Sequence, residues 1–247
     1  GTIVYTTLFY IPKKAPFDLY YPEYKAGVKL YINRVFITED DKELMPTYLR
    51  FIKGVIDSED LPLNVSREIL QQNKVLSKIK SNSVKKVLTE ISKLAKNPEK
   101  YNDFYKEFGR PIKEGLYQDY ENRDTLLELI RFNSTKSADM TSFAGYVKGM
   151  SKGQKNIYFI TGTDSRTLKN SPLIEMYKKK NIEVCIFDDE IDDIVLSSVF
   201  KYKDFDLKSV NYSDATDDLK DKNYIDIIDL YQKGLLTKNL INPVYSS

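Results

Sequence analysis

The chain has 247 residues, of which 41% are apolar and 30% are charged, and its formal net charge at pH 7 is only +2. This length allows one large domain or two small ones, and the composition is that of a soluble globular protein. The small net charge gives no argument for binding to nucleic acid. No apolar run reaches the roughly 20 residues that a membrane-spanning helix requires.

The absence of histidine and the presence of a single cysteine limit the chemistry further. Without histidine the chain has neither serine–histidine or cysteine–histidine catalysis nor an imidazole ligand for a metal. One cysteine cannot form an intrachain disulfide. Cys185 lies in the apolar run 182–187, which favours a buried, unreactive thiol. We therefore expect no metal site and expect any chemistry to rest on arginine, lysine, carboxylates and amides.

Residues 2–11 are rich in β-branched and aromatic side chains, which predicts a strand. Two prolines in residues 12–18 predict a loop, which continues into the apolar run Leu19-Tyr20-Tyr21. Two interpretations are open for this loop. Its apolar side chains fold back onto the domain, or they present a patch to a partner protein.

Residues 28–37 alternate as a strand does, with Val28, Leu30 and Ile32 on one face, and we place Phe36 in the core. Pro46 then suits the first position of a helix. The apolar residues after it predict the buried face of that helix: Tyr48, Leu49, Phe51, Ile52 and Val55.

The most informative stretch is residues 57–73. Pro62 ends the preceding element, because proline cannot continue a hydrogen-bonded ladder or a helix interior. Asn64 and Ser66 are suitable N-cap residues. With Ser66 as the cap, Arg67 is the first helical residue, and Gln71 lies on the same face four residues later.

A cation at the start of a helix is unfavourable, because the first turn carries partial positive charge and unpaired N–H groups. One interpretation is that Arg67, Gln71 and the helix N-terminus form a site for an anion. The other is that Arg67 forms a salt bridge with Asp57, Glu59 or Asp60.

From Ser66 the apolar spacing predicts a long helical region that reaches about Leu94, with Ser81-Asn-Ser83 as a candidate interruption. Two amphipathic helices, 101–108 and 123–132, then flank the segment 109–115, which contains glycine and proline.

Beyond a polar boundary at 133–139, strands and helices alternate, which predicts a parallel sheet with a crossover helix. The turn 161–165 lies where nucleotide-binding folds place a phosphate loop, but it lacks their glycine and lysine pattern. We interpret it as an ordinary β–α turn. The predicted strands are 156–161 and 182–187, and the predicted helices are 173–180 and 190–200.

The stretch 57–73 resembles the catalytic loop in the middle domain of the heat-shock protein 90 family. The residues that carry the resemblance are Asp60-Leu-Pro-Leu-Asn-Val-Ser-Arg-Glu68 and Leu70-Gln-Gln-Asn73. Further segments fit the same family: Gly27–Tyr31, Arg34–Ile37, Pro46–Phe51 and Gly54–Ser58. The resemblance covers most of the chain and weakens toward its C-terminal end.

The resemblance implies an α/β fold of two α/β/α sandwich units joined by a short helical connector. The implied division is a larger α/β unit with the catalytic loop at 1–97, a connector at 98–138, and a smaller α/β unit at 139–210. Residues 211–247 would be a linker and the start of a C-terminal dimerisation domain.

The resemblance also implies the middle segment of an ATP-dependent molecular chaperone. ATP with Mg²⁺ would be held mainly by an N-terminal domain outside this chain. Arg67 would reach the γ-phosphate, with Gln71 and Asn64 as further catalytic residues. The full-length protein would be an ATPase, and this fragment alone would be inactive. Phe17 would contact client proteins, and Phe36 would position the catalytic loop.

The implied partners are client proteins, cochaperones, the protein's own N- and C-terminal domains and a second copy in a homodimer, with no nucleic acid and no membrane span. Residues 108–115 resemble bacterial and organellar members, whereas other segments resemble the endoplasmic-reticulum branch. The compartment therefore stays open between the cytoplasm and the lumen of a mitochondrion, plastid or endoplasmic reticulum.

Two other classes of function compete with the chaperone. A self-contained nucleotide or sugar-phosphate enzyme would need its own phosphate cradle and acid–base pair, for which the sequence offers no candidate. A non-enzymatic protein-interaction scaffold needs neither, and the residues taken without the resemblance do not separate it from the chaperone.

Overall fold

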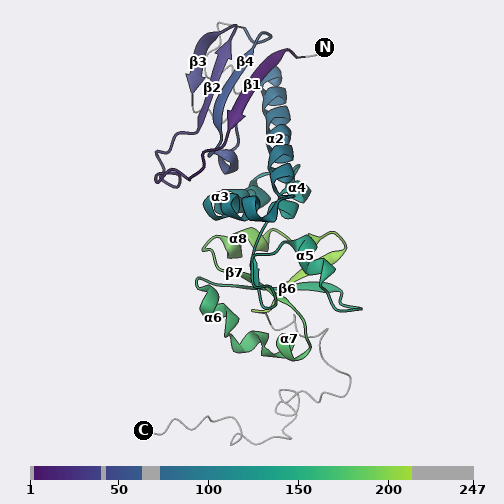
Figure 1. The fold of residues 1–247 in the computed structure, drawn as a ribbon. Helices are drawn as coiled ribbons and strands as arrows, with labels where there is room; N and C mark the ends of the chain where they lie inside the picture. Colours follow the sequence, from purple (N-terminus) through teal and green to yellow (C-terminus); the bar gives the residue numbers. More distant parts are fainter. Residues whose placement is uncertain (1–2, 40–42, 63–72, 213–247) are drawn as a thin grey trace, which may run out of the picture. The chain divides into compact units, whose positions relative to one another are not determined.

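The computed structural model describes residues 3–39, 43–62 and 73–212. These residues form a mixed α/β fold with two β-sheets and helices (Figure 1), which confirms the predicted α/β class. Among the described residues, no helix has both the length and the apolar character needed to cross a membrane.

The first sheet has four strands in the order β1-β4-β2-β3. The central strand β4 pairs antiparallel with β1 and parallel with β2, and β3 pairs antiparallel with β2. The strands are β1 (Tyr5–Tyr10), β2 (Gly27–Ile32), β3 (Val35–Glu39) and β4 (Lys53–Ser58).

One face of this sheet contributes to the hydrophobic core. Val28, Leu30 and Ile32 of β2 are buried on that face, as predicted, and the register places Ile56 of β4 beside Leu30. Helix α2 (Lys74–Leu94) runs along β1 in Figure 1 and buries its own apolar side chains in the same core.

The single strand predicted for residues 28–37 is a hairpin. Asn33 and Arg34 join β2 to β3 with φ angles of 49° and 68°. Positive φ at both central residues matches the twist of the flanking strands. The turn pairs Phe36 with Tyr31, on the sheet face opposite Leu30. The prediction that Phe36 is a core residue was therefore wrong, and its side chain is 51% exposed.

The helix predicted from Pro46 was also wrong. Only the short 3-10 helix η1 (Thr47–Leu49) forms, and the chain continues as β4. Gly54 has a φ of 148°, which no right-handed helix contains. Strands β1 and β2 pair with both edges of this segment. Hydrogen bonds to two other strands therefore stabilise residues 53–58 as a strand, although the local pattern predicts a helix up to Val55.

Helix α2 begins at Lys74, and the predicted helix start at Ser66 lies outside the described residues. The side chain of Asn73 accepts hydrogen bonds from the N–H groups of Val75 and Leu76, and its backbone is extended. A helix from Ser66 therefore does not pass unbroken through Asn73. The candidate interruption at 81–83 lies inside the helix, where Ser83 is buried.

Helix α3 (Pro98–Gln118) is continuous through the segment 109–115, which was predicted to lie outside helices. Gly109 allows the ring of Tyr105 to lie close to the backbone, because a Cβ there would be 2.7 Å from that ring. Phe108 stacks on Phe51 with ring centroids 4.6 Å apart. Burial of this aromatic face stabilises the helix despite the proline at position 111.

The second sheet has five strands in the order β5-β7-β6-β9-β8, and β6 is parallel to both β7 and β9. The predicted parallel pair of strands is therefore confirmed, whereas β8 and β9 were not predicted. The strands are β5 (Asn133–Ser134), β6 (Asn156–Thr161), β7 (Val184–Phe187), β8 (Lys201–Tyr202) and β9 (Phe205–Ser209).

The remaining helices are short. They are α4 (Arg123–Leu129), α5 (Phe143–Lys148), α6 (Ser165–Lys169), η2 (Pro172–Ile174), α7 (Glu175–Lys179) and α8 (Asp192–Ser197). Residues 1–211 cluster as one unit. Residues 212–247 form a second unit, of which only Tyr212 belongs to the described residues.

The contact between β1 and β4 predicts the effect of a substitution at Gly54. A Cβ at this position would collide with the carbonyl oxygen of Leu8 on β1. We expect Gly54→Ala to lower the free energy of unfolding, measured by urea denaturation, by about 3 kcal/mol or more. Gly153→Ala is the control, because Gly153 also has a positive φ but has no atom near its Cβ position. That variant should lose about 1 to 2 kcal/mol, and an equal loss for both variants would contradict the prediction.

Candidate functional site

The three predicted catalytic residues, Asn64, Arg67 and Gln71, lie outside the described residues. The structure describes the chain on both sides of them. Leu61, which follows β4, is buried in the core, and Asn73 caps α2. The segment 63–72 therefore lies between a core residue that follows β4 and the N-cap residue of α2.

Two of the acidic residues that could neutralise Arg67 have structural partners. Asp57 accepts a hydrogen bond from the N–H of Arg34 at 3.2 Å, and Asp60 accepts one from the N–H of Val4 at 2.6 Å. Each carboxylate thus accepts a hydrogen bond from a main-chain N–H group near a neighbouring strand or turn. Asp57 and Asp60 therefore have structural roles that do not depend on Arg67.

Phe36 lies near the end of β4 that leads into the segment 63–72. Its ring meets the ring of Tyr31 edge-on, with centroids 5.7 Å apart. Tyr31 is in turn the sheet neighbour of Asp57 on β4. Phe36 is therefore exposed on the face that carries Tyr31, and its role in positioning the loop stays a prediction.

The loop of residues 12–24, which joins β1 to β2, presents Phe17 to solvent. The side chain of Phe17 is 88% exposed, and its ring contacts Tyr21 edge-on at 6.2 Å. Leu19, two residues later, is 1% exposed. Of the two interpretations of this loop, folding back onto the domain holds for Leu19 and exposure holds for Phe17.

Arg50 connects this loop to α3. Its guanidinium donates two hydrogen bonds to the carboxylate of Glu114, at 2.6 and 2.9 Å, and its Nε donates to the carbonyl oxygen of Leu19 at 3.0 Å. The side chains of Arg50 and Glu114 are only 12% and 13% exposed. The sequence pattern does not predict this pair, because its partners are 64 residues apart and leave no periodic signal.

A second buried ion pair joins α3 to α8. Lys113 Nζ lies 2.7 Å from the carboxylate of Asp192, whose side chain is almost fully buried. Burial raises the pKa of Asp192, and the neighbouring Lys113 partly offsets that effect. The sequence pattern does not predict this pair either, since its members are 79 residues apart.

The turn 161–165 is the β–α turn that the sequence predicts. The side chain of Asp164 caps α6 by accepting a hydrogen bond from the N–H of Thr167 at 2.7 Å. A carboxylate therefore occupies the helix N-terminus at which a phosphate loop would bind its anion. Cys185 is fully buried, as expected, and burial raises the pKa of its thiol well above the ordinary value. Within the described ranges, no group of three or more cysteine or carboxylate side chains is placed to hold a metal.

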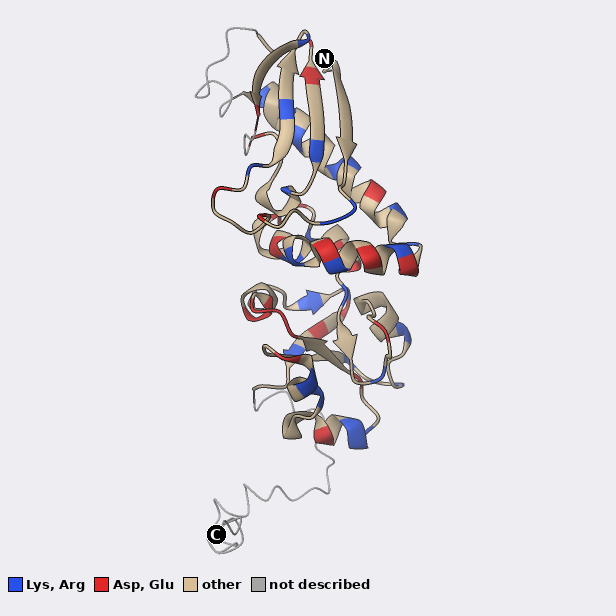
Figure 2. Ribbon diagram, turned by 60° about the vertical axis from the view of Figure 1, so that its left-hand side comes forward, with Lys and Arg blue, Asp and Glu red and all other residues tan. Residues whose placement is uncertain are grey.

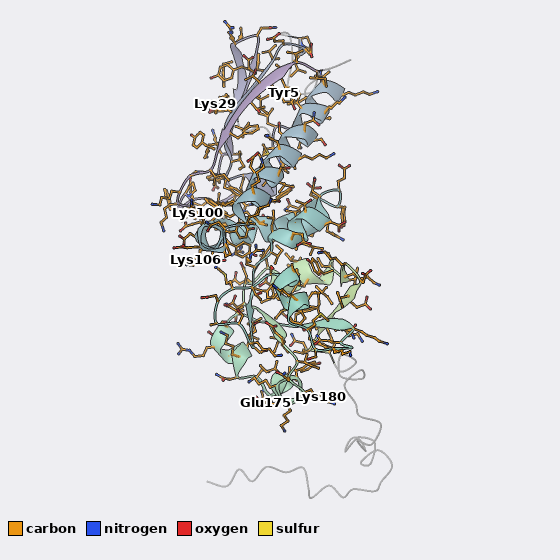
Figure 3. All side chains as sticks on the ribbon, turned by 45° about the vertical axis from the view of Figure 1, so that its right-hand side comes forward. Tyr5, Lys29, Lys100, Lys106, Glu175 and Lys180 are labelled. Carbon is orange, nitrogen blue, oxygen red and sulfur yellow. The ribbon has the colours of Figure 1, made fainter. Side chains whose placement is uncertain are left out.

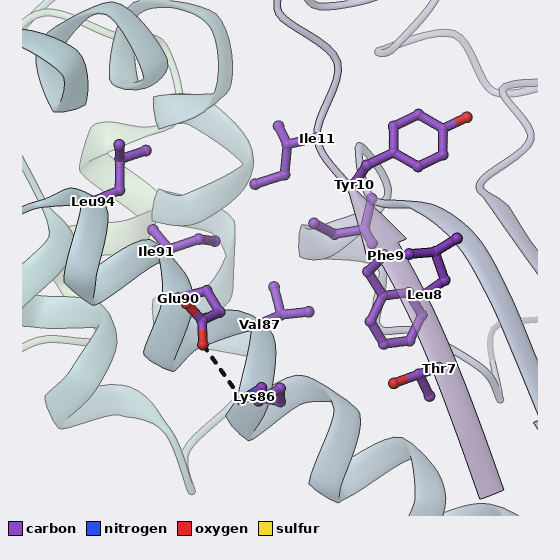
Figure 4. Close-up of a pocket in the computed structure, with 11 residues that line it drawn as sticks. Thr7, Leu8, Phe9, Tyr10, Ile11, Lys86, Val87, Glu90, Ile91 and Leu94 are labelled. Carbon is purple, nitrogen blue, oxygen red and sulfur yellow. Dashed lines mark ion pairs between the residues drawn. The ribbon is translucent and has the colours of Figure 1, made fainter.

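A hollow of about 330 Å³ lies between β1 and α2 (Figure 4). Lys86 and Glu90 form an ion pair of 3.4 Å beside it. The hollow has no group of convergent polar side chains that would carry out chemistry. Its lining is mainly apolar: Leu8, Phe9, Ile11, Val87, Ile91 and Leu94.

Glu107 of α3 holds the loop 12–24 at its other end. Its carboxylate accepts a hydrogen bond from the N–H of Ala15 at 2.9 Å and pairs with Lys14 at 2.9 Å. The Ala15 N–H, and then Lys14, lower the pKa of Glu107 below its ordinary value of 4.5. Because the folded pKa is the lower one, the contact stabilises the folded loop above pH 4.5. Its contribution is lost as the pH falls through the folded pKa.

This contact predicts the acid titration of the Ala15 amide. We expect the NMR chemical shift of that amide proton to change with a midpoint below pH 4.5, the ordinary pKa of the Glu107 carboxyl. Glu107→Gln keeps an acceptor oxygen but cannot ionise, so it should abolish this change. A midpoint at or above the ordinary pKa would contradict the assigned contact.

The chain matches the family model described as Hsp90 protein over residues 1–229. It is 59% identical over 224 residues to the chaperone protein HtpG of Treponema denticola. It is 57% identical over 224 residues to the HtpG of Wolinella succinogenes. These alignments cover 89% and 90% of this chain but 35% and 36% of the relatives. The chain therefore spans little more than a third of the length of these relatives.

Among solved structures, the middle domain of a Plasmodium falciparum heat shock protein matches with a TM-score of 0.74 and 31% sequence identity. The match covers 86% of this chain and 84% of that one. Sequence and fold thus agree on the same part of the same kind of protein. The chain belongs to the Hsp90 family of chaperones and corresponds to its middle domain.

Proposed function

We propose that this chain is the middle segment of an ATP-dependent chaperone and supplies Arg67 to the γ-phosphate of ATP bound by a separate N-terminal domain. The observation that carries the proposal is the motif at 57–73, in a chain that matches the Hsp90 family over residues 1–229. In this proposal Gln71 hydrogen-bonds beside the same phosphate and Asn64 helps to fix the loop.

An arginine is suited to this role by its charge and its donors. In phosphoryl transfer, negative charge is spread over the oxygens of the transferred phosphate, and a guanidinium neutralises it with several N–H groups. Mg²⁺ held with the ATP would neutralise charge on the same phosphates. The burial of Leu61 and the capping of α2 by Asn73 support the proposal, because they fix the chain on both sides of the segment that carries Arg67.

Separate sites for the nucleotide and the arginine would couple hydrolysis to movement of the domains. Arg67 would complete the catalytic group only when the N-terminal domain closes on this segment. ATP turnover would then report on a conformational change of the whole protein, which is what a chaperone that cycles between client-bound states requires.

A self-contained nucleotide enzyme is less well supported. The only β–α turn that the sequence offered as a phosphate site has the carboxylate of Asp164 at its helix N-terminus. A phosphate there would be repelled by that charge.

We expect calorimetry of the 247-residue chain to detect no micromolar binding of ATP. A micromolar dissociation constant would favour the self-contained enzyme.

Phe17 is proposed to contact client proteins. The ring of Phe17 is large, apolar and 88% exposed. Binding of an apolar segment over this ring would remove apolar surface from water, which is favourable. A non-enzymatic interaction scaffold would use the same ring without any role for Arg67, so a test of Arg67 separates the two functions. Cochaperones, homodimerisation of the full-length protein and the role of Phe36 in loop positioning belong to the same proposal.

The domain division is proposed on the same basis: 1–97, 98–138, 139–210, and 211–247 as the start of a C-terminal dimerisation domain. The strands of the first sheet all precede residue 98. Strand β5 (Asn133–Ser134) lies within the proposed connector but pairs with β7 of the second sheet. The connector therefore supplies one edge of the smaller unit.

We expect Arg67→Ala in the full-length protein to lower ATP hydrolysis about tenfold or more, because a donor to the transition state is lost. Binding of ATP should be nearly unchanged, since the N-terminal domain holds the nucleotide. Lys74→Ala is the matched control, because it removes an exposed cation at the start of α2 and should leave turnover unchanged. Wild-type turnover in Arg67→Ala would remove Arg67 from the mechanism and leave the scaffold as the better candidate.

We expect Phe17→Asp in the full-length protein to weaken the holding of unfolded protein, measured as suppression of light scattering by thermally unfolded citrate synthase. The melting temperature should stay within about 2 °C of wild type, because Phe17 buries little surface in the folded chain. A large fall in the melting temperature would show instead that Phe17 contributes to the core.

A further inference from the structure

The loop 12–24 is held on both sides of Phe17. Two residues before it, the N–H of Ala15 donates to Glu107 at 2.9 Å. Two residues after it, the carbonyl of Leu19 accepts from Arg50 at 3.0 Å, and the side chain of Leu19 is buried. Phe17 is therefore the exposed tip of a short segment whose two ends are both attached.

Successive tight turns give the segment a defined shape. The N–H of Leu19 donates to the carbonyl of Pro16 at 3.1 Å, and the N–H of Tyr21 donates to the carbonyl of Asp18 at 2.9 Å. These turns bring the rings of Phe17 and Tyr21 into edge-on contact. The two exposed rings form one small apolar surface, which we call the Phe17–Tyr21 surface.

The partners of the loop share one face of α3. Glu107, Arg110 and Glu114 occupy positions i, i+3 and i+7, which lie above one another on a helix. Glu107 binds Ala15, and Glu114 binds Arg50. The ring of Tyr20 lies over the guanidiniums of Arg50 and Arg110, at 5.3 and 5.2 Å.

The charged residues in the first half of α3, before Glu107, face solvent instead. Acidic and basic residues are interspersed along this helix (Figure 2), and Lys100 and Lys106, labelled in Figure 3, are exposed. Asp103 forms an ion pair with Lys106 at 3.5 Å, and its side chain is 76% exposed. The attachment of the loop is therefore specific to the face that carries Glu107 and Glu114, and does not follow from the general charge of the helix.

We propose that Glu107 and Arg50 are positioning residues that hold the loop 12–24 in one conformation, so that the Phe17–Tyr21 surface is formed before a client binds. The partner is an extended, apolar segment of an unfolded protein. This inference rests on the proposed contact between Phe17 and clients.

The gain from such attachment is entropic. A loop with free ends would populate many conformations, and its affinity for a client would fall by the fraction that presents the two rings together. Two rings in edge-on contact are too small a surface for a folded partner, whose interfaces bury far more area. The two rings are large enough to contact one or two apolar side chains of an extended segment. An unfolded protein exposes such side chains, whereas a folded protein buries most of them.

The absence of tryptophan from the chain allows a direct test of the attachment. Phe17→Trp places a single tryptophan at the tip of the loop of the 247-residue chain, and its anisotropy on excitation at the red edge, where tyrosine does not absorb, reports local motion. In this background, Glu107→Ala should lower the anisotropy clearly, while the melting temperature stays within about 2 °C.

Two further variants serve as controls in the same background. Glu107→Gln keeps an oxygen that accepts from the Ala15 N–H and should restore most of the anisotropy. Glu90→Ala removes a carboxylate that also pairs with lysines, Lys86 and Lys93, but has no contact with the loop, and it should leave the anisotropy unchanged. Anisotropy equal to that of the parent in Glu107→Ala would overturn the proposal.

The functional test uses the full-length protein and the citrate synthase assay. Glu107→Ala, with Phe17 intact, should weaken holding about threefold or more, and Glu107→Gln should recover it. If Phe17→Asp weakens holding but Glu107→Ala does not, the client contact stands and the positioning role is wrong. If Phe17→Asp also has no effect, the client contact itself fails, and the functional part of this inference fails with it. The anisotropy still decides separately whether Glu107 orders the loop.

Discussion

The bidentate salt bridge between Arg50 and Glu114 is the interaction on which the arrangement around the first sheet depends. Arg50 lies just before β4, whereas Glu114 belongs to α3. The same guanidinium also donates to the carbonyl oxygens of Leu19 and Thr47. One side chain thus connects the loop, the 3-10 turn and the helix, which the planar fork of arginine allows and the single ammonium of lysine does not. Because both side chains are largely shielded from water, loss of either would leave a charge without its partner in a poorly solvated place.

The contact depends on the continuity of α3. Its aromatic residues pack on Phe51, which adjoins Arg50, so burial of these rings brings Glu114 and Arg50 together. The same helix binds α8 through Lys113 and Asp192. Helix α3 therefore sets the position of the loop 12–24 and also joins the residues of the first sheet to those of the second. An apolar contact makes the arrangement favourable, and the charged contacts select one geometry within it.

The two proposed functional segments are connected by β4. Arg50, which binds the loop 12–24, precedes this strand, and the segment 57–73 begins within it and continues beyond it. As an interior strand, β4 is hydrogen-bonded on both edges. If the loop 12–24 binds clients and the segment 57–73 reaches the nucleotide, the two sites lie at opposite ends of β4. Because β4 is an interior strand, the distance between them would be fixed. The movement that a chaperone cycle requires would then have to occur at the boundaries of this domain.

Several errors in the predicted elements have a common physical cause. Residues 46–55 have the spacing of an amphipathic helix, yet pairing with strands far away in the sequence draws most of them into a turn and a strand. Segment 109–115 has glycine and proline, yet aromatic packing keeps it helical. Phe36 has the chemistry of a core residue, but the unpredicted turn at Asn33 places it on the outer face. In the first two cases a contact between distant residues outweighs a local preference of about 1 kcal/mol per residue, and in the third a turn changes the face to which the side chain points.

The sequence by itself determined the α/β class, the parallel pairing in the second sheet, the buried thiol of Cys185 and the family, since these depend on local patterns or on long motifs. It also singled out Arg67, because the pattern predicts an arginine in a first helical turn, and Phe17, because the loop that carries it resembles the client-contact segment of the family. Only the tertiary structure decided that Phe17 is exposed while Leu19 is buried, and that Glu107 and Arg50 hold the loop between them. Those contacts join residues 31 to 92 positions apart, and their geometry exists only after α3 and the first sheet have packed together.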